Sequence, residues 1–312
     1  MNYEIKKQPE SDNSDSGEVV QIDVDDLGVD AYNVRGGEWI RDEEFIQDLK
    51  NNGFINPLTV RRADPSTGKK YAIVCGSQRY YTAIDAGYTE VPCFIKKMDD
   101  VTAIGRSIAE NKYSKDVPAW RYALMIGEMK GRLDDGKDIE EIVEVIMEKT
   151  GFSRTSVIRY LDIAGLPWEI IELMKEPSER SEKVMELLKG LFVTNTETLS
   201  LDKAFKIATE LRGFPKDKLI EVAVDILGLS KDKAFQIIET AKAYPKKSMG
   251  EIRDIVYEIR KDGWWESEFR FKPHVSEALN TACVKKSMDK KELVMHYVET
   301  GLKRDRYLLE AE

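Results

Sequence analysis

The sequence has few of the residues that most often bind metals or act as nucleophiles. It contains three cysteines, Cys75, Cys93 and Cys283, without C-x-x-C spacing, and two histidines, His274 and His296. An odd number of unpaired cysteines argues against a disulfide framework, and Cys75 and Cys93 lie in apolar runs typical of buried strands. So few histidines argue against a histidine-based metal site or a serine hydrolase triad. We therefore expect buried thiols in a reducing cytoplasm.

Long apolar runs are also missing. No run in the sequence approaches the roughly 18 to 20 residues that a membrane-spanning helix requires. The first ten residues, MNYEIKKQPE, lack the apolar core of a signal peptide. Charged residues make up 34% of the 312 residues, and this length suits two or three domains. We expect a soluble, cytoplasmic protein without a membrane partner.

The net charge of -9 is concentrated near the N-terminus. Residues 1–50 carry 5 basic and 14 acidic side chains, so the remaining residues balance to zero. Residues 1–17 are rich in Ser, Asp, Glu and Asn, and we expect them to form a disordered acidic tail. DNA binding needs only a local basic surface, so the net charge neither supports nor excludes it.

The stretch from 71 to 95 predicts a strand, a glycine turn, a short helix and a second strand. A helix that starts directly after a strand leaves backbone N–H groups unpaired at the positive end of its dipole, where phosphate binds. A solvated turn is the alternative, because short glycine motifs recur by chance. The candidate anion ligands are the residues of this turn, Gly76, Ser77, Gln78 and Arg79.

Neighbouring patterns complete a small mixed α/β unit. Strands are predicted at 19–24, 58–60, 71–75 and 91–95, and helices at 43–52 and 100–111. The first helix is expected to be capped by Asp42 and the second by Asp99-Asp100. The second helix carries Ile104 and Ile108 on its buried face and ends at Glu110 and Asn111. A carboxylate and an amide suit magnesium that is shared with phosphates. The alternative is that these two residues only end a helix.

Taken together, these segments resemble a known family. Two segments are similar, in order and separation, to two boxes of the ParB partition proteins and their ParB/sulfiredoxin superfamily. These segments are GSQRYYTAIDAGYTEVP (76–92) and ENKYSKDVPAWRYA (110–123). DAYNVRGGEWIRDEEFIQDLKNNGFINPLTVRR (30–62) resembles the first box, which includes Arg35. The resemblance covers roughly residues 20–245 and implies a pocket for CTP or another nucleotide with magnesium. It assigns nucleotide binding to Arg35, Gly76, Ser77, Gln78, Arg79, Glu110 and Asn111, with Glu110 and Asn111 near the metal.

Two departures from the family pattern affect this pocket. The GERR-type box has an acidic residue and a further arginine where this chain has Ser77 and Gln78. The ENLQR-type box keeps Glu110 and Asn111 but continues with Lys112, Tyr113 and Ser114. One lost arginine removes a charge-assisted phosphate contact of about 1.5 to 3 kcal/mol.

After Pro118 the sequence predicts helices. The pattern is typical of a helix-turn-helix: a first helix, a turn at Thr150-Gly151, and a second helix capped by Ser153. The apolar stripes are Ile139, Ile142, Val143 and Ile146 on the first helix, and Val157, Ile158 and Leu161 on the inner face of the second. The outward face of the second helix is expected to carry Arg154, Thr155, Ser156 and Arg159. GFSRTSVIRYLDIAGLP (151–167) is similar to the ParB recognition helix. Arginine and hydroxyl side chains suit phosphates and base edges. The predicted DNA-contacting residues are Ser153, Arg154, Thr155, Ser156 and Arg159.

Two near copies follow, LSLDKAFKIATE (199–210) and LSKDKAFQIIET (229–240). Each predicts a Ser-capped helix that buries its Phe and Ile, with an intervening helix around 219–227 packed between them. We expect this block to support the DNA-binding helices. A packed helical hairpin without DNA contacts is the alternative for the helix-turn-helix.

The C-terminal segment resembles a ribbon-helix-helix module. Phe269 and Phe271 alternate with Arg270 and Lys272 in a short strand, and two helices follow. Two chains would pair such strands into a ribbon for the DNA major groove, so a homodimer is expected. A terminal helical hairpin is the alternative, and Arg270 and Lys272 are the candidate DNA contacts.

These features predict an α+β protein. We expect an acidic tail at 1–17, a ParB/sulfiredoxin-like nucleotide-binding domain at 18–115, an all-helical DNA-binding domain at 116–248 and a dimerisation segment at 249–312. The leading hypothesis is a ParB-like protein for plasmid or chromosome partition that binds double-stranded DNA. It would lie on the nucleoid or a plasmid and work with a ParA-type ATPase. Slow CTP hydrolysis, a superfamily enzyme such as a small-molecule kinase, and a transcriptional regulator or nucleoid-occlusion factor with a vestigial pocket remain open.

Overall fold

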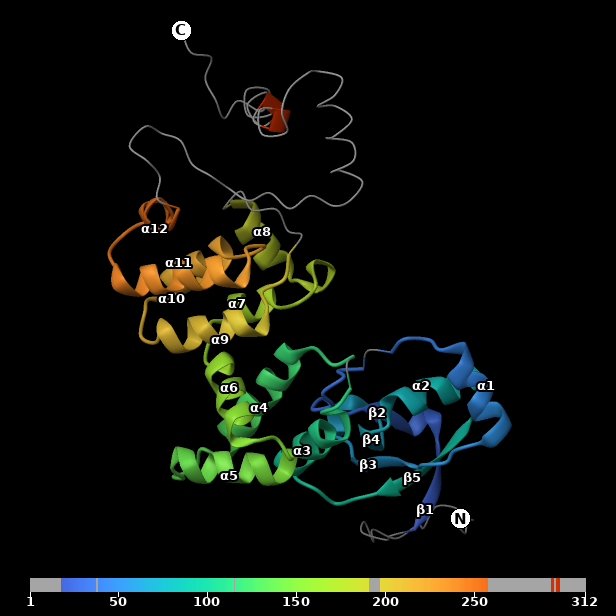
Figure 1. Cartoon of the computed structure of the whole chain (residues 1–312). Helices are drawn as coiled ribbons and strands as arrows, with labels where there is room; N and C mark the ends of the chain where they lie inside the picture. The colour runs from blue at the N-terminus through green and yellow to red at the C-terminus, as the bar shows by residue number, and fades with distance from the viewer. Residues whose placement is uncertain are drawn as a thin grey trace. The chain divides into compact units, whose positions relative to one another are not determined.

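The structure is a computed structural model that describes residues 18–37, 39–114, 116–190 and 197–257, together with 293–294 and 296–297. The chain divides into two compact units, residues 1–256 and 257–312. The described residues lie almost entirely in the first unit (Figure 1). The predicted acidic tail and the predicted C-terminal ribbon with Arg270 and Lys272 lie outside the described residues.

A five-stranded mixed sheet forms the N-terminal part, in the order β1-β5-β3-β4-β2. β1 pairs antiparallel with β5 and β3 pairs antiparallel with β4, whereas β3–β5 and β2–β4 are parallel. The strands are β1 (Val19–Asp23), β2 (Leu27–Val29), β3 (Leu58–Arg62), β4 (Tyr71–Cys75) and β5 (Glu90–Ile95). The four predicted strands are therefore present, and the sequence patterns missed the short edge strand β2.

Three helices accompany the sheet: α1 (Glu43–Asn52), α2 (Ser77–Ala86) and α3 (Asp100–Asn111). α1 and α2 pack against each other, and α3 packs on β4 (Figure 1). Asp42 and Asp99 cap α1 and α3 with their side chains, as the sequence predicts. The sheet core contains Ile22, Leu58, Val60, Ile73 and Cys93, all fully buried. This core fixes the end of β4, where α2 begins.

Beyond Pro118, the described residues form helices and no strand, so the predicted α+β class is confirmed. The longer helices are α4 (Ala119–Leu133), α5 (Ile139–Thr150), α6 (Arg154–Ala164), α9 (Leu201–Glu210), α10 (Lys216–Asp225) and α11 (Lys231–Ala243). The shorter ones are α7 (Trp168–Leu173), α8 (Glu182–Gly190) and α12 (Met249–Val256). α6 packs against α4, α5 and α9, so it lies at the centre of the helical part.

Two residues expected in the helix-turn-helix core are exposed instead. Ile139 is 50% exposed and Ile158 is 38% exposed. Ile139 is the first residue of α5 and extends beyond the packed turns of that helix. On α6, Val157 and Ile163 form the buried face, and Ile158 lies about 100° around the helix from Val157.

The repeated helices α9 and α11 also differ from the expectation. They pack directly against each other, and α10 contacts both without separating them. Ala204 and Ala234 are fully buried, because small side chains let the helices approach closely, while Phe205 and Phe235 are only half-buried. Cations cover both rings, with Arg159 lying 5.2 Å from the Phe205 ring centre and Lys206 5.3 Å from that of Phe235.

Candidate functional site

The predicted anion site begins where β4 ends and α2 starts. Gly76 is the N-cap of α2, adopts the left-handed conformation with φ 96°, and provides no side-chain cap. Its backbone N–H donates a hydrogen bond to Oε2 of Glu110 at 3.2 Å. Ser77 is buried, with 2% of its surface exposed. The first turn of α2 therefore presents backbone donors at its positive end, with a carboxylate beside them.

Arg79 is held by the protein in this structure. Its Nη1 donates to the carbonyls of Asn56 and Pro57 at 2.7 and 2.9 Å, and its Nη2 donates to Oε1 of Glu110 at 2.8 Å. The sequence predicts this guanidinium as a phosphate fork. The observed ion pair weighs against that role, because an anion has to compete with Glu110 for the guanidinium.

Arg35 joins the same region from a distant segment. Its Nε donates to Oδ1 of Asn111 at 2.7 Å, and its Nη2 donates to Oγ of Ser114 at 2.9 Å. Asn111 is 5% exposed and donates through Nδ2 to the carbonyl of Ser107 at 2.9 Å. The amide oxygen of Asn111 thus positions Arg35, which is a different contact from the predicted magnesium contact.

The loop before Arg35 is pinned to the sheet. The side chain of Asn33 donates to the carbonyl of Val74 at 3.1 Å, and its oxygen accepts from the backbone N–H of Arg35 at 3.0 Å. The backbone N–H of Val34 donates to Oγ of Ser107 on α3 at 2.9 Å. These bonds place Arg35 between the end of β4 and the end of α3.

A small cavity of about 40 Å³ lies between these segments. Its lining is Arg35, Ile40, Gln78, Asp116, Val117, Pro118 and Arg121. The structure therefore brings the predicted residues together in two groups: Arg35 and Gln78 line this cavity, while Gly76, Arg79 and Glu110 are joined by direct bonds. Residue types and spacing do not identify Arg121 as a site residue. The only signal was its position inside the second box-like segment, at the first turn of α4.

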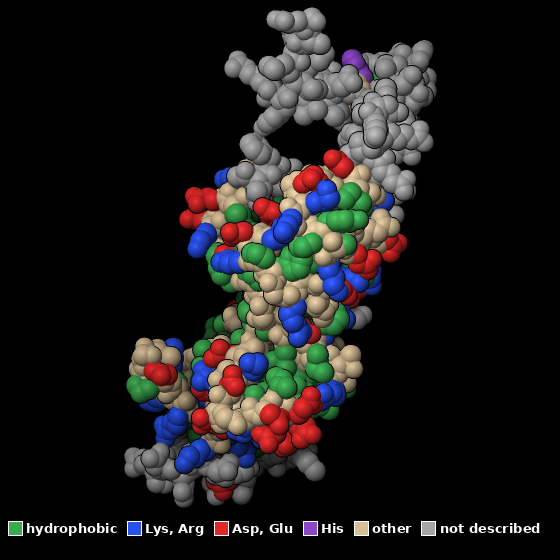
Figure 2. Space-filling model, turned by 90° about the vertical axis from the view of Figure 1, so that its left-hand side faces the viewer, with side chains coloured by type: hydrophobic (Ala, Val, Ile, Leu, Met, Phe, Trp, Pro, Cys, Tyr) green, Lys and Arg blue, Asp and Glu red, His purple; other side chains and the backbone are tan. Residues whose placement is uncertain are grey.

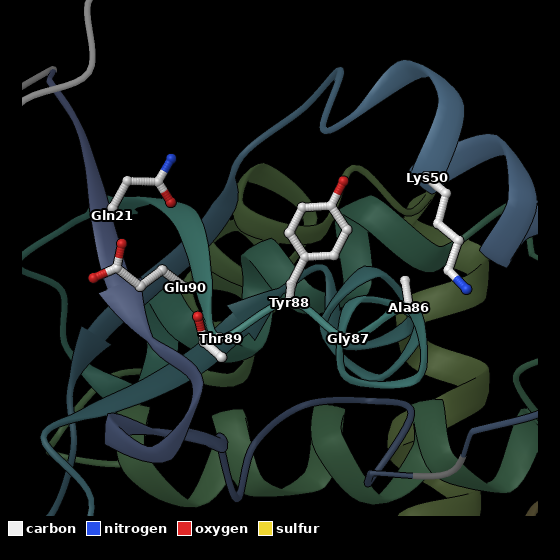
Figure 3. A pocket seen from close by; sticks show the side chains of 7 residues that line it. All are labelled: Gln21, Lys50, Ala86, Gly87, Tyr88, Thr89 and Glu90. Atoms are coloured by element: carbon white, nitrogen blue, oxygen red, sulfur yellow. The ribbon is translucent and has the colours of Figure 1, made fainter.

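A larger, open hollow of about 490 Å³ lies at the other end of α2. Figure 3 shows Tyr88 between Lys50 on one side and Gln21 and Glu90 on the other. This lining contains one lysine and one glutamate and none of the candidate nucleotide-binding residues. The hollow is therefore distinct from the candidate anion site.

Cys75 lies next to the candidate site but is not prepared for thiolate chemistry. Burial, together with the adjacent Glu110 carboxylate, raises the pKa of its thiol to about 12. Burial alone raises the pKa of Cys93 to about 12. Sulfiredoxin-type chemistry requires a thiolate, so these environments do not favour it.

We predict that both thiols resist labelling in the folded protein. In a Cys283→Ser chain at pH 8, Ellman's reagent should react with Cys75 and Cys93 on the order of a thousandfold more slowly than with free cysteine, because the thiolate fraction falls with the raised pKa. Denaturant should release both thiols. Rapid labelling of one thiol in the native protein would show that its burial is not maintained in solution.

The helix-turn-helix consists of α5, the turn at Gly151 and α6. Gly151 adopts φ 68° and ends α5, and the Ser153 side chain caps α6 by accepting from the N–H of Ser156 at 3.2 Å. Ser153, Arg154 and Thr155 are exposed at the start of α6. The predicted helix pair, turn and cap are therefore present, and the N-terminal turn of α6 is accessible.

The two arginines of α6 are ion-paired in this structure. Arg154 contacts Glu140 of α5, with Nη1 2.6 Å from Oε2. Arg159 contacts Asp202 of α9, which also accepts from Lys231 at 2.7 Å. The hydrogen bond from Lys231, followed by that from Arg159, lowers the pKa of Asp202. Arg159 therefore faces α9, whereas the sequence placed it on the outward face. On the face shown in Figure 2, basic and acidic side chains are interspersed.

Together, these elements define two parts: a mixed α/β part with the candidate site between β4, α2 and α3, and a helical part that contains a helix-turn-helix. Residues 8–112 match the ParB N-terminal domain. This match assigns about a third of the chain, at its N-terminal end, to the ParB N-terminal domain family. No described helix of the chain combines the length and hydrophobicity needed to cross a membrane.

Among similar proteins is the chromosome-partitioning protein Spo0J of Thermus thermophilus, which is 29% identical over 50% of this chain and 60% of that protein. Another is the chromosome-partitioning protein ParB of Caulobacter vibrioides, which is 30% identical over 51% of this chain and 56% of that protein. The chain thus spans little more than half of these relatives.

Two solved structures of C-terminally truncated ParB from Caulobacter crescentus are also similar. One is complexed to the centromeric parS site, with 21% identity, TM-score 0.35, and coverage of 76% of this chain and 98% of that one. The other is complexed with CTP-γ-S, with 22% identity, TM-score 0.26, and coverage of 67% and 99%. Such low TM-scores add no support to the assignment.

Proposed function

We propose that this chain is a partition-type DNA-binding protein in which a nucleotide near α2 and α3 controls how the helical part holds DNA. Residues 18–115 would bind the nucleotide, 116–248 would bind double-stranded DNA, and 249–312 would pair two chains. CTP is the proposed nucleotide, and a ParA-type ATPase is the proposed partner. The expected location is the nucleoid or a plasmid in the cytoplasm.

The observation that carries the proposal is the position of α3. Its C-terminal end supplies Glu110 and Asn111 to the candidate site, and the next residue, Lys112, donates through Nζ to the carbonyl of Gly151 at 3.2 Å. Gly151 forms the turn of the helix-turn-helix. α3 also packs closely on α5, because a Cβ at Gly105 would lie 2.6 Å from Cβ of Lys149. One helix therefore contacts both the anion site and the DNA-binding motif.

This arrangement supports a simple form of control. A nucleotide that draws Glu110 away from Arg79 would free a guanidinium for phosphate and would remove one restraint on the end of α3. The turn at Gly151 would respond through Lys112. A ligand shifts such an equilibrium only by its differential affinity for the two states, so breaking the Glu110–Arg79 pair is the proposed difference.

Magnesium is expected to arrive with the nucleotide. No group of three or more His, Cys, Asp or Glu side chains in the described part of the chain could hold a metal ion. Glu110 provides one carboxylate, which suits magnesium that takes most of its ligands from phosphates and water. Asn111 would have to release Arg35 before its amide oxygen could act as a ligand.

Titration with nucleotide tests the proposal directly. CTP, ATP and ADP, each with magnesium, should be titrated by calorimetry into wild type and Arg79→Ala. Wild type should bind CTP, and the variant should bind it more weakly. If neither wild type nor Arg79→Ala binds a nucleotide, the nucleotide is removed from the proposal. That result would favour a transcriptional regulator or nucleoid-occlusion factor that uses the same DNA surface. Transfer of phosphate to a small acceptor would favour the kinase, and slow CTP loss would indicate hydrolysis.

We predict that the arginines of α6 contribute to DNA affinity. On a duplex selected from a random library by the wild-type chain, Arg154→Ala and Arg159→Ala should each weaken binding by about 1 to 3 kcal/mol if the arginine reads a base. Arg41→Ala is the matched control, because Arg41 is an exposed, ion-paired arginine of the N-terminal part. Fluorescence anisotropy measures the affinities. Unchanged binding by both α6 variants would move the DNA site to the C-terminal segment with Arg270 and Lys272.

A further inference from the structure

An isoleucine that the apolar pattern places in the core lies instead in the middle of the exposed face of α6. Val157 and Ile163 form the buried face of this helix, whereas Ile158 is 38% exposed. Because each residue turns a helix by about 100°, Ile158 lies about 40° from Arg154 and about 60° from Thr155 around the axis. Arg154 and Thr155 are both exposed. The three side chains therefore share one accessible face, with the apolar side chain between the two polar ones.

Folding alone gives little reason for an isoleucine at this position. Ile158 contributes less to the core than Val157 and Ile163, each of which is fully buried. As a β-branched residue it also lowers helix propensity relative to Ala, Lys or Glu, which suit exposed helix positions. Single exposed apolar side chains are common on protein surfaces, so the meaning of this one depends on what the face of α6 contacts.

The charges around the start of α6 suit an anionic partner. Helices α1, α3, α5, α9 and α11 each combine a side-chain cap with an acidic residue in the first turn, whereas α6 has the cap without the carboxylate. The first carboxylate of α6 is Asp162 in its last turn, and Arg212 pairs with it at 2.6 Å. Glu140, from α5, pairs with Arg154 across an exposed contact, and such pairs are weak enough to exchange for a phosphate or a base. The face that carries Ile158 is therefore compatible with a DNA backbone.

We propose that Ile158 is a specificity-determining residue that contacts the 5-methyl group of a thymine in the major groove. This inference rests on the proposed DNA-binding function and assigns one base type to one side chain. The second helix of a helix-turn-helix enters the major groove, where thymine presents an apolar methyl group that the other bases lack. Arg154 and Thr155 would supply the hydrogen bonds to phosphates or base edges on either side of this contact.

The contact has a size and a salt dependence of its own. Removing one methyl group from water changes an affinity about three- to tenfold. The contact neutralises no phosphate, so the Ile158 side chain adds nothing to the slope of affinity against salt concentration. An arginine that contacts phosphate, by comparison, changes that slope when it is removed. These two properties separate a methyl contact at Ile158 from a general contribution to DNA binding.

Uracil substitution in the DNA tests the contact, because deoxyuridine differs from thymidine only by the missing 5-methyl group. In a duplex selected from a random library by the full wild-type chain, each thymidine should be replaced in turn and the affinity measured by fluorescence anisotropy. At least one replacement should weaken wild-type binding about three- to tenfold. Ile158→Ala should bind the unmodified duplex more weakly by a similar factor, with an unchanged salt slope, and should lose nothing further from uracil at that position.

Two further variants complete the test. Ile158→Val keeps the β-branch and should show a reduced response to uracil, so it carries the test if Ile158→Ala does not fold. Ile84→Ala is the matched control, because Ile84 is 42% exposed on α2 of the mixed α/β part, and it should respond to uracil as wild type does.

Three results would overturn the inference and leave the proposed function intact. They are a wild-type response to uracil in both Ile158 variants, a wild type that tolerates uracil at every position, and a selected site without thymine. If the wild-type chain selects no duplex at all, the proposed function fails and the inference fails with it.

Discussion

Arg61→Met is expected to lower the free energy of unfolding by about 3 to 5 kcal/mol, since it leaves a buried carboxylate without its partner. Arg61 on β3 donates through Nε to Oδ2 of Asp30 at 2.6 Å and through Nη1 to Oδ1 of Asp100 at 2.7 Å. The side chain of Asp30 is 2% exposed. Urea denaturation followed by circular dichroism measures the loss.

The neighbouring arginine on the same strand provides the control. Arg62 is exposed and lies 5.0 Å from the ring centre of Tyr71, so Arg62→Met should cost no more than about 1 kcal/mol. The double variant Arg61→Met/Asp30→Asn should recover part of the stability, because no buried charge remains. If it were as unstable as Arg61→Met, the loss would come from packing and not from the unpaired charge.

This ion-pair network also connects the sheet to the helices that carry the site. Arg132 of α4 pairs with Asp100 at 3.0 Å, and the Tyr32 ring lies 5.6 Å from the Arg61 guanidinium carbon and 4.7 Å from that of Arg132. The first residues of α3 are thus fixed by Arg61 and Arg132, while the last residues reach Arg79 and Gly151. We infer that motion at the proposed nucleotide site is concentrated at the C-terminal end of α3.

Sequence patterns were sufficient where local chemistry determines the structure. Asp42, Asp99 and Ser153 accept hydrogen bonds from the backbone of the helices that they cap, and such caps depend on a few neighbouring residues. The glycine turns at Gly76 and Gly151 were predicted for the same reason. The convergence of Arg35, Glu110 and the α2 start was also expected, but from the ordered boxes and not from residue spacing.

Features that depend on tertiary contacts were not predictable in this way. β2 has three residues and lies at the edge of the sheet, too short for a period of two to be recognised. The ion pairs of Arg79 with Glu110 and of Arg159 with Asp202 join residues 31 and 43 positions apart. Amphipathic patterns identify the buried face of a helix. They do not show which Lys or Arg side chains on the opposite face form an ion pair with a carboxylate of another helix or strand.

Gly76→Ala is expected to destabilise the protein by about 2 to 5 kcal/mol and to abolish nucleotide binding. Part of this loss, about 1 to 2 kcal/mol, arises because φ 96° is unfavourable for a residue with a Cβ. The remainder, about 1 to 3 kcal/mol, is overpacking, since the new Cβ would lie 2.7 Å from Cδ2 of Leu58 and 3.0 Å from Nη2 of Arg79. Urea denaturation and CTP titration measure the two effects.

The other end of the same helix separates these two causes. Gly87 ends α2 with φ 88°, and a Cβ there would meet nothing within 4 Å, so Gly87→Ala should lose only the conformational part, about 1 to 2 kcal/mol, and should keep nucleotide affinity. Equal destabilisation by both substitutions would show that Leu58 moves aside without cost. If only Gly76→Ala loses CTP binding, glycine is required at position 76 because the phosphates and Arg79 must come close to the start of α2.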